Sequence, residues 1–304
     1  MVKKVKRGFE FMISKEPNDL DFTKEKLSEL TKEQLIDRYL DLLDKKTSQE
    51  DFLLNISHDL RSPLNVILSI LQCYKYSGNN SEKMEEYLDM IKRNGYKILK
   101  LVNNLIDSTK LYTDHYELKK KNVEIISLIE WNISNIDRYA RQKDISLVFD
   151  TNVEECVMAA DIEAIDRIIV NLISNAIKFS PRESCIYINV LKKDKDITIF
   201  VKDQGIGIPL KEQKDIFNRF VQSSRNNKNE YTGSGIGLDL VKRLVQAHEG
   251  TIELESEENL GTEFRIKLPI IKLNEEEENK KENNYLSAKD KVDVLEVEFS
   301  DIYL

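Results

Sequence analysis

An imidazole and a carboxylate stand side by side in Ser57–Leu64, which reads Ser-His-Asp-Leu-Arg-Ser-Pro-Leu. At 100° per residue, the apolar side chains of a helix here fall within about 80° of arc, and His58 points about 160° from their middle. This stripe consists of Ile56, Leu60, Leu64, Ile67 and Leu71. The helix therefore holds His58 in solvent, where an imidazole can exchange protons near neutral pH, with Asp59 beside it and Ser62 one turn on. An exposed His is usually an ordinary surface residue, so its importance depends on the downstream motifs.

A second set of polar side chains suits a metal-bound polyphosphate. On a helix over residues 162–178, Asn171, Asn175 and Lys178 cluster within about 60° of arc, away from the apolar stripe. An amide oxygen can ligate Mg²⁺, which takes further ligands from phosphates and water, and an ammonium neutralises phosphate charge. The alternative is an ordinary polar face in an Asn-rich chain, so this cluster needs support from other motifs.

Two glycine-rich runs supply that support. The strand-like run Ile197–Lys202 leads into Asp203–Ile208, which reads Asp-Gln-Gly-Ile-Gly-Ile. Its glycines let the backbone approach a flat ligand, and Asp203 can accept a hydrogen bond from an exocyclic amine. Gly233–Leu238, which reads Gly-Ser-Gly-Ile-Gly-Leu, opens a helix whose N-terminal amides would hold phosphate. This second run matches neither a Rossmann fingerprint nor a Walker loop, because no strand precedes it and Gly-Lys-Ser/Thr is absent.

Two long helices are expected to present His58. A capping-box pattern at Thr31–Gln34 begins a lead-in helix, which runs into a helix from near Ser48 to about Tyr76. A turn over Ser77–Ser81 precedes a second amphipathic stretch. Two helices joined by a short loop form an antiparallel hairpin, which buries its apolar stripe poorly alone. Two hairpins are therefore expected to pair about a two-fold axis as a four-helix bundle.

After about residue 117 the pattern changes to alternating helices and strands. Helical stretches are expected over 124–142, 161–179 and 235–248. Strand-like runs are Ile145–Phe149, Ile186–Leu191, Ile197–Lys202, Thr251–Ser256 and Glu263–Leu268. This order predicts an α+β layer, with helices on one face of a mixed sheet. The tail after Leu273 is expected to be disordered, although Val292–Phe299 alternates like a strand that docks.

Composition excludes several classes of protein. The chain has 304 residues and a net charge of −8, of which −6 lies in residues 274–304, with ten acids and four bases. No basic face suggests binding to nucleic acid, and no run approaches the roughly 20 apolar residues of a membrane span. Three scattered cysteines indicate reduced thiols and a cytoplasmic location. If an upstream segment has been removed, the chain would lie at the inner face of the membrane.

The order of these motifs resembles the catalytic core of a bacterial two-component sensor histidine kinase, over residues 48–270. Five segments carry the resemblance: Ser57–Leu64 (H box), Asn171–Phe179 (N box), Asp203–Gly207 (G1 box), Ile216–Phe220 (F box) and Gly233–Leu238 (G2 box). The resemblance implies an α+β protein whose N-terminal helical hairpin forms a dimeric four-helix bundle. An α/β-sandwich ATP-binding domain of the Bergerat or GHKL type would follow.

The resemblance also implies domain boundaries. Residues 1–46 would be an N-terminal segment with the lead-in helix, and 47–116 the dimerisation and histidine phosphotransfer domain. Residues 117–272 would be the catalytic ATP-binding domain, and 273–304 an acidic, disordered tail.

Residue roles follow from the same resemblance. His58 would be the phosphoacceptor, its Nε2 attacking the γ-phosphate of ATP, while Asp59 takes the imidazole proton or orients the ring. Asn175 would ligate Mg²⁺. The other residues implied to bind the nucleotide are Asn171, Lys178, Phe179, Asp203, Gly205, Gly207, Ile208, Arg219, Gly233, Gly235, Gly237 and Leu238. Ser62 stands where the family usually has the Thr or Asn that aligns water for dephosphorylation, which leaves phosphatase activity in question.

Two other functions compete with the kinase. ATP hydrolases of the wider superfamily place a water-activating Glu where this chain has Asn171, and an amide cannot take the proton. A degenerate kinase that acts only as a dimeric scaffold is the second, although every catalytic motif position appears filled. For the kinase, the implied partner is the receiver domain of a response regulator, whose aspartate would accept the phosphoryl group.

Overall fold

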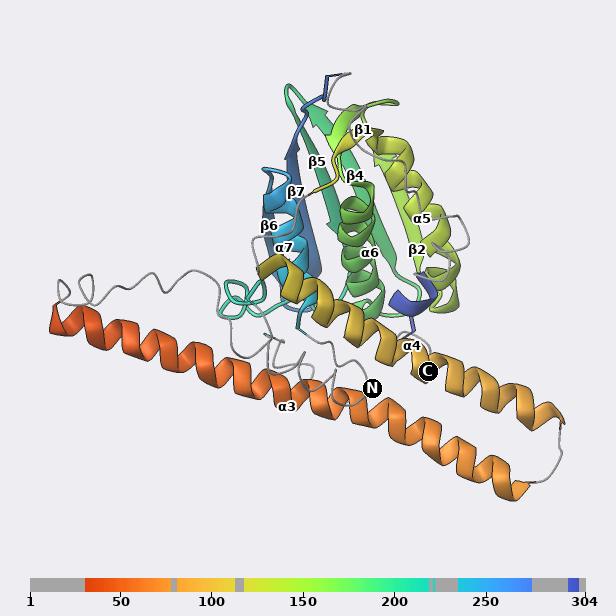
Figure 1. The fold of residues 1–304 in the computed structure, drawn as a ribbon. Coiled ribbons are helices and arrows are strands. Elements are labelled where there is room, and N and C mark those ends of the chain that lie inside the picture. The colour runs from red at the N-terminus through yellow and green to blue at the C-terminus, as the bar shows by residue number, and fades with distance from the viewer. Residues whose placement is uncertain are drawn as a thin grey trace.

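The structure is a computed structural model that describes residues 31–77, 81–112, 118–218, 221, 235–274 and 295–300. Two parts are evident in Figure 1: a long antiparallel pair of helices, α3 (Lys32–Ser77) and α4 (Ser81–Tyr112), and a layered α+β unit that lies over it. Within the described residues, no helix combines the length and apolar character needed to cross a membrane.

α3 is one continuous helix. Its predicted capping box is present, because the Thr31 N–H donates to Gln34 Oε1 (2.9 Å) and the Gln34 N–H donates to Thr31 Oγ1 (3.3 Å). The helix expected to begin near Ser48 is instead the second half of α3, so that boundary was wrong. Residues 32–62 contain neither Gly nor Pro, so nothing in them stops the helix.

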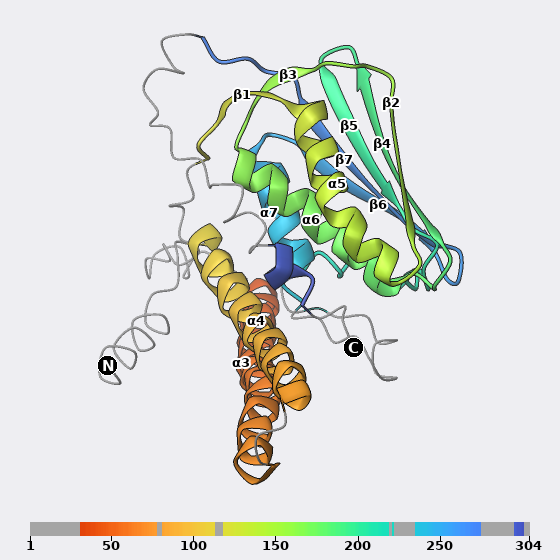
Figure 2. The same cartoon turned by 90° about the vertical axis from the view of Figure 1, so that its right-hand side faces the viewer.

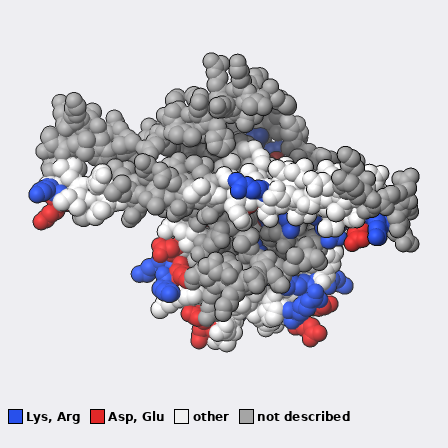
Figure 3. Space-filling view, turned by 90° about the horizontal axis from the view of Figure 1, so that it is seen from below, with Lys and Arg blue, Asp and Glu red and all other residues white. Residues whose placement is uncertain are grey.

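The hairpin leaves much of its apolar surface uncovered in a single chain. Of the stripe predicted to face a core, Leu64 and Leu71 are 47% and 50% exposed, whereas Ile70, which lies outside that stripe, is 6% exposed. Viewed from below, uncharged atoms predominate along the described part of the hairpin (Figure 3). A second hairpin would cover these leucines. The four-helix bundle therefore stays a prediction, and the exposed leucines are a physical reason for it.

The α+β unit is built on a five-stranded mixed sheet. Its strands are β2 (Ser146–Thr151), β4 (Cys185–Lys193), β5 (Asp196–Lys202), β7 (Gly261–Pro269) and β6 (Thr251–Glu257), in that spatial order. β2 and β4 are parallel, and the other neighbours are antiparallel. Figure 2 shows the helices gathered on one face of the sheet. Both the mixed sheet and the one-sided helix layer confirm the prediction.

Three helices form that layer: α5 (Ile125–Gln142), α6 (Ile162–Phe179) and α7 (Gly237–Ala247). All three were predicted to within two residues, as their apolar periodicity is strong. Two short strands were missed, β1 (Lys121–Glu124) and β3 (Val157–Ala160), which pair antiparallel with each other. Runs of four residues are too short for alternation to reveal them.

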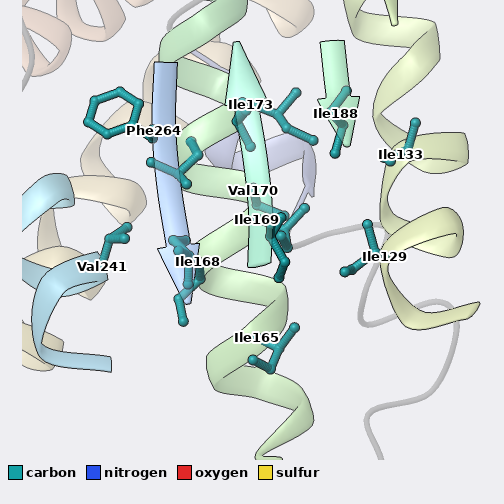
Figure 4. Close-up of a cluster of buried hydrophobic side chains, with 14 of the residues drawn as sticks. Ile129, Ile133, Ile165, Ile168, Ile169, Val170, Ile173, Ile188, Val241 and Phe264 are labelled. Carbon is teal, nitrogen blue, oxygen red and sulfur yellow. The ribbon is translucent and has the colours of Figure 1, made fainter. Parts of the chain in front are cut away.

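The core lies between α6 and the sheet, and Figure 4 shows part of it. Ile165, Ile168, Ile169 and Ile173 of α6 are each 0–1% exposed, and Val170 is 6% exposed. They pack with side chains of α5, α7, β4 and β7, among them Ile129, Val241, Ile188 and Phe264. Burial of this isoleucine stripe fixes the rotation of α6, and the polar face with Asn171 and Asn175 is thereby turned away from the core.

Within the acidic tail, the structure describes residue 274 and residues 295–300. Residues 295–298 form a helical turn that continues as a turn to Ser300, and Leu295 and Phe299 are 3% and 0% exposed. The expected docking therefore occurs, but as a helical turn instead of a strand, and the expected disorder does not apply to these residues. Residues 275–294 and 301–304 lie outside the described residues.

A buried histidine ties α7 to the start of α6. The ring of His248 is 3% exposed; its Nε2 accepts from the Asp161 N–H (3.1 Å), and its Nδ1 lies 2.8 Å from the Leu244 carbonyl oxygen. Because Nε2 accepts, Nδ1 must donate, which requires a neutral ring. Burial lowers the pKa of His248, as expected for a group held neutral. The role of His248 in this structure is therefore to join the end of α7 to the start of α6.

The neutral ring predicts a pH effect on stability. The unfolded chain takes up a proton at His248 below about pH 6.5, whereas the folded chain resists it, so stability from this group is lost as pH falls below that value. We expect the free energy of unfolding of His248→Gln to depend less steeply on pH between about 5 and 7 than that of the natural chain. Urea titrations across that range measure it. Parallel curves for the two proteins would contradict a neutral buried His248.

Candidate active site

A cavity of about 370 Å³ lies between the hairpin and the α+β unit. Among the predicted site residues that the structure describes, all except Gly205 line it. These are His58, Asp59, Ser62, Asn171, Asn175, Lys178, Phe179, Asp203, Gly207, Ile208, Gly235, Gly237 and Leu238. Residues from both ends of the sequence thus meet around one space. Arg219 and Gly233 lie outside the described residues.

The hairpin contributes the nucleophile candidate. The side chain of His58 is 82% exposed, as the helical arithmetic predicted, and its Nδ1 lies 3.6 Å from Asp59 Oδ1. This separation is within ion-pair range but longer than a normal hydrogen bond. The carboxylate therefore sits at Nδ1 and leaves the Nε2 side of the ring for a reaction partner. Ser62 is exposed one turn further along and lines the same cavity.

The polar face of α6 contributes the amides and the ammonium. Asn171 Nδ2 donates to the Arg167 carbonyl (2.9 Å), which fixes this amide group against its own helix. Asn175 is half-buried, and Lys178 is 5% exposed with its Nζ 5.5 Å from the centre of the Phe179 ring. An ammonium buried at the cavity wall can attract an anion strongly, because the low-dielectric surroundings strengthen its field.

Lys143, which no pattern in the sequence singled out, binds the end of this helix. Lys143 Nζ donates to the carbonyl oxygens of Ile177 (2.8 Å), Lys178 (2.9 Å) and Ser180 (2.8 Å). The last carbonyls of a helix have no partner within it, so the cation satisfies them and complements the helix dipole. Lys143 thereby positions the end of α6, where Lys178 and Phe179 line the cavity.

Asp203, at the end of β5, is held by the backbone around it. Its Oδ1 accepts from the N–H groups of Gly205 (2.7 Å) and Thr262 (3.1 Å). Burial raises the pKa of Asp203 to about 6, although both backbone hydrogen bonds act in the opposite direction. Both bonds use Oδ1, so Oδ2 is the atom placed to receive a donor from the cavity. Gly205 acts here as a donor to Asp203 and does not line the cavity itself.

Two glycines are required by geometry. Gly207 has a φ of +65°, and a Cβ there would lie 2.0 Å from the Glu257 carbonyl oxygen, so no other residue fits this approach to the β6–β7 turn. A Cβ on Gly237 would lie 2.7 Å from Asn171 Oδ1. Gly237 therefore lets the start of α7 approach the amide face of α6, as two walls of one ligand site must.

Several cavity residues were not foreseen. Lys97, Lys100, Leu101 and Asn104 come from α4, and Glu298 comes from the C-terminal turn. Their side chains meet the cavity only because α4 lies against the α+β unit, an arrangement that no local pattern in the sequence encodes.

The donor set fits Mg²⁺ only with help from a ligand. The described residues contain no group of three or more His, Cys, Asp or Glu side chains able to hold a metal. An amide oxygen such as that of Asn175 supplies one ligand, so the remaining ligands must be phosphate oxygens and water, the arrangement that Mg²⁺ favours. Asn175 could therefore hold Mg²⁺ only together with phosphate oxygens and water.

Two family models match the chain. The model described as "Histidine kinase-, DNA gyrase B-, and HSP90-like ATPase" matches residues 160–272. The model described as "His Kinase A (phospho-acceptor) domain" matches residues 48–112. Together they join a phosphoacceptor helical domain to an ATP-binding domain, on the same two parts of the structure that form the cavity.

A curated relative resembles this chain in sequence, and two solved structures resemble it in fold. The sensor histidine kinase TmoS of Ectopseudomonas mendocina is 36% identical over 242 residues, covering 78% of this chain and 24% of TmoS. Full-length ShkA in complex with AMPPNP has a similar fold (TM-score 0.56, 24% identity, 74% of this chain and 46% of ShkA). So does ThkA in complex with the response regulator protein TrrA (TM-score 0.58, 20% identity, 80% of this chain and 68% of ThkA).

The chain belongs to the two-component sensor histidine kinases. It spans about a quarter of the length of TmoS and, likewise, 27% of the autoinducer 2 sensor kinase/phosphatase LuxQ of Vibrio vulnificus.

Proposed function

We propose that this protein is an ATP-dependent protein histidine kinase that phosphorylates its own His58 and passes the phosphoryl group to an aspartate of a response regulator. The observation that carries the proposal is the shared cavity: His58 and Asp59 line the same space as Asn175, Lys178 and Asp203. A phosphoryl transfer needs the nucleophile and the nucleotide at one place, with charge neutralisation around the phosphates.

The chain's own residues supply the remaining parts of the reaction. Asp203 Oδ2 would accept from the exocyclic amine of adenine, and Lys178 would neutralise charge on the phosphates. Nε2 of His58 would form the new bond to the γ-phosphorus as the bond to the ADP oxygen breaks. Asp59, 3.6 Å from Nδ1, would orient the ring and stabilise or accept the proton at that nitrogen.

Mg²⁺ is the metal that this donor set favours, with the Asn175 amide oxygen as the protein ligand. When bound, it would neutralise the developing phosphate charge. Asn171 and the loop ending at Gly237 would lie beside the same phosphates, because they approach within contact distance of each other.

Hydrolysis of ATP to free phosphate is disfavoured by the residue at position 171. Nδ2 of Asn171 donates to the Arg167 carbonyl, and an amide cannot act as a general base for water. The scaffold alternative is disfavoured because the cavity brings together residues from both parts of the chain that a kinase needs.

Two partners are proposed for this chain: a second copy of itself and a response regulator. The leucines left exposed on α3, Leu64 and Leu71, favour a homodimer in which two hairpins form a four-helix bundle. A phosphorylated His58 on an exposed helix would be accessible to the receiver domain of a response regulator.

The test is to incubate the purified chain with γ-labelled ATP and Mg²⁺ and to follow the protein-bound label and the free phosphate together. We expect label that is stable in base and labile in acid, the behaviour of a phosphohistidine, with little free phosphate. Phosphate release without protein label would establish the hydrolase instead. Nucleotide binding without either product would establish the scaffold.

A further inference from the structure

The C-terminal turn Leu295–Ser300 touches both parts of the molecule. In Figure 1 it is the short dark-blue segment between α4 and α5. Its apolar side chains are buried, with Leu295, Val297 and Phe299 at 3%, 8% and 0% exposed, and Leu295 and Phe299 belong to the core of the α+β unit. The ring of Phe299 stacks on that of Tyr139 in α5, with centroids 4.5 Å apart and planes inclined by 12°. A fully buried, stacked aromatic side chain anchors the turn to the ATP-binding part.

The acidic side chains of the same turn contact the hairpin. Glu296 Oε2 lies 2.9 Å from Lys92 Nζ, and Glu298 Oε1 lies 3.2 Å from Lys100 Nζ. Lys100 Nζ also donates to the Glu298 carbonyl oxygen (2.5 Å). The pKa of Glu296 is lowered, chiefly by its hydrogen bond to Lys92. Both lysines belong to α4, so one turn is bound to α5 by an aromatic ring and to α4 by two ion pairs.

The two ion pairs differ in exposure. The Lys100 and Glu298 side chains are 16% and 17% exposed, whereas those of Lys92 and Glu296 are 54% and 32% exposed. Solvent and salt screen the second pair more strongly than the first. The aromatic anchor and the Lys100 contact therefore supply most of the attachment, and the Lys92 pair can be changed with little disturbance of the fold.

This attachment lies at the edge of the reaction site. Lys100 and Glu298 line the cavity that also contains His58 and the nucleotide-facing groups. Phe299 does not line it, so this ring can affect the reaction only through the placement of the two parts. Holding reacting groups together replaces an encounter between mobile domains with a nearly unimolecular step.

We propose that Leu295–Ser300 is a clasp that holds the ATP-binding part against the hairpin, with His58 at the nucleotide cavity, and thereby accelerates the phosphorylation of His58. Phe299 and Glu296 are positioning residues in this clasp. The proposal rests on the proposed kinase activity for its kinetic readout, but the existence of the clasp can be measured without any reaction.

The first experiment compares the full chain with Phe299→Ala. We expect the rate of His58 labelling at saturating ATP to fall about tenfold, while the KM for ATP stays within about twofold, because no nucleotide-facing group is changed. Hydrogen exchange at residues 295–300 should be slow in the natural chain, where the Phe299 N–H donates to the Leu295 carbonyl (2.9 Å), and fast in the variant.

A charge-reversal series controls for the possibility that Phe299→Ala slows labelling only because the variant unfolds. Glu296→Lys places two ammonium groups together, so labelling should slow, and Lys92→Glu in the same chain should restore it. A clasp variant that exchanges fast at residues 295–300 yet labels at the natural rate, or faster, would overturn the proposal. Fast exchange at these residues in the natural chain would overturn it too. Slow exchange without any labelling would refute the kinase activity and leave the attachment itself established.

Discussion

Asn175→Ala is expected to reduce labelling of the protein by γ-labelled ATP about 100-fold or more. The amide oxygen of Asn175 is the proposed protein ligand of Mg²⁺, and a metal at the phosphates contributes several kcal/mol to such a reaction. The loss should be visible in nucleotide binding as well. Addition of Mg²⁺ should tighten binding of ATP to the natural chain and leave the affinity of Asn175→Ala nearly unchanged, as measured by calorimetry with and without the metal.

Asn135→Ala provides a matched control for that substitution. Asn135 is also on a helix, α5, where its Nδ2 donates to the Trp131 carbonyl (2.7 Å), but it does not line the cavity. This variant should label at the natural rate. If Asn175→Ala labels as fast as Asn135→Ala, Asn175 is not the metal ligand.

Asp203→Asn is expected to bind ATP about 10- to 100-fold more weakly while folding more stably. Asn can keep the two backbone hydrogen bonds through Oδ1, but it places an NH₂ where Oδ2 was. That NH₂ opposes the exocyclic amine of adenine, and a lost hydrogen bond to a charged group is worth about 1.5–3 kcal/mol.

The gain in stability follows from the raised pKa of Asp203. Burial raises this pKa to about 6 from its ordinary value of 3.8, so ionising the carboxyl costs folding free energy that is fully expressed above pH 6. Asn removes that cost, of order 2–3 kcal/mol, which urea titration at pH 7.5 would detect. For the same reason, ATP affinity of the natural chain should fall as pH drops through 6. A variant that loses both affinity and stability would show that Asp203 serves the fold alone.

The sequence predicted the parts of this molecule that repeat at a regular period. The isoleucine stripe of α6 fixed both the helix and the direction in which Asn171, Asn175 and Lys178 face, and the strands around Asp203 alternated clearly. The polar face of α6 was predictable for the same reason. The roles of the residues in the glycine-rich runs came instead from the resemblance to sensor histidine kinases.

What the sequence did not reveal depends on contacts between distant segments. β1 and β3 are four residues each and gain their hydrogen bonds from one another. Lys143 binds the Ile177 carbonyl at the end of α6 across 34 residues, and Lys100 binds Glu298 across 198 residues. Local periodicity in the sequence cannot predict such pairings between distant segments. The alternation in Val292–Phe299 did suggest docking. However, residues 295–300 form a helical turn followed by a turn, and Leu295 and Phe299, four positions apart, are both buried.

The most direct test of the central claim is to ask which of the three histidines carries the phosphoryl group. The measurement is acid-labile label from γ-labelled ATP on the natural chain, His58→Gln and His115→Gln, with ATP affinity determined for each. If His58 is the phosphoacceptor, His58→Gln should bind ATP normally and acquire no label, whereas His115→Gln should be labelled like the natural chain. Label that persists in His58→Gln would contradict the assignment of His58 as the phosphoacceptor.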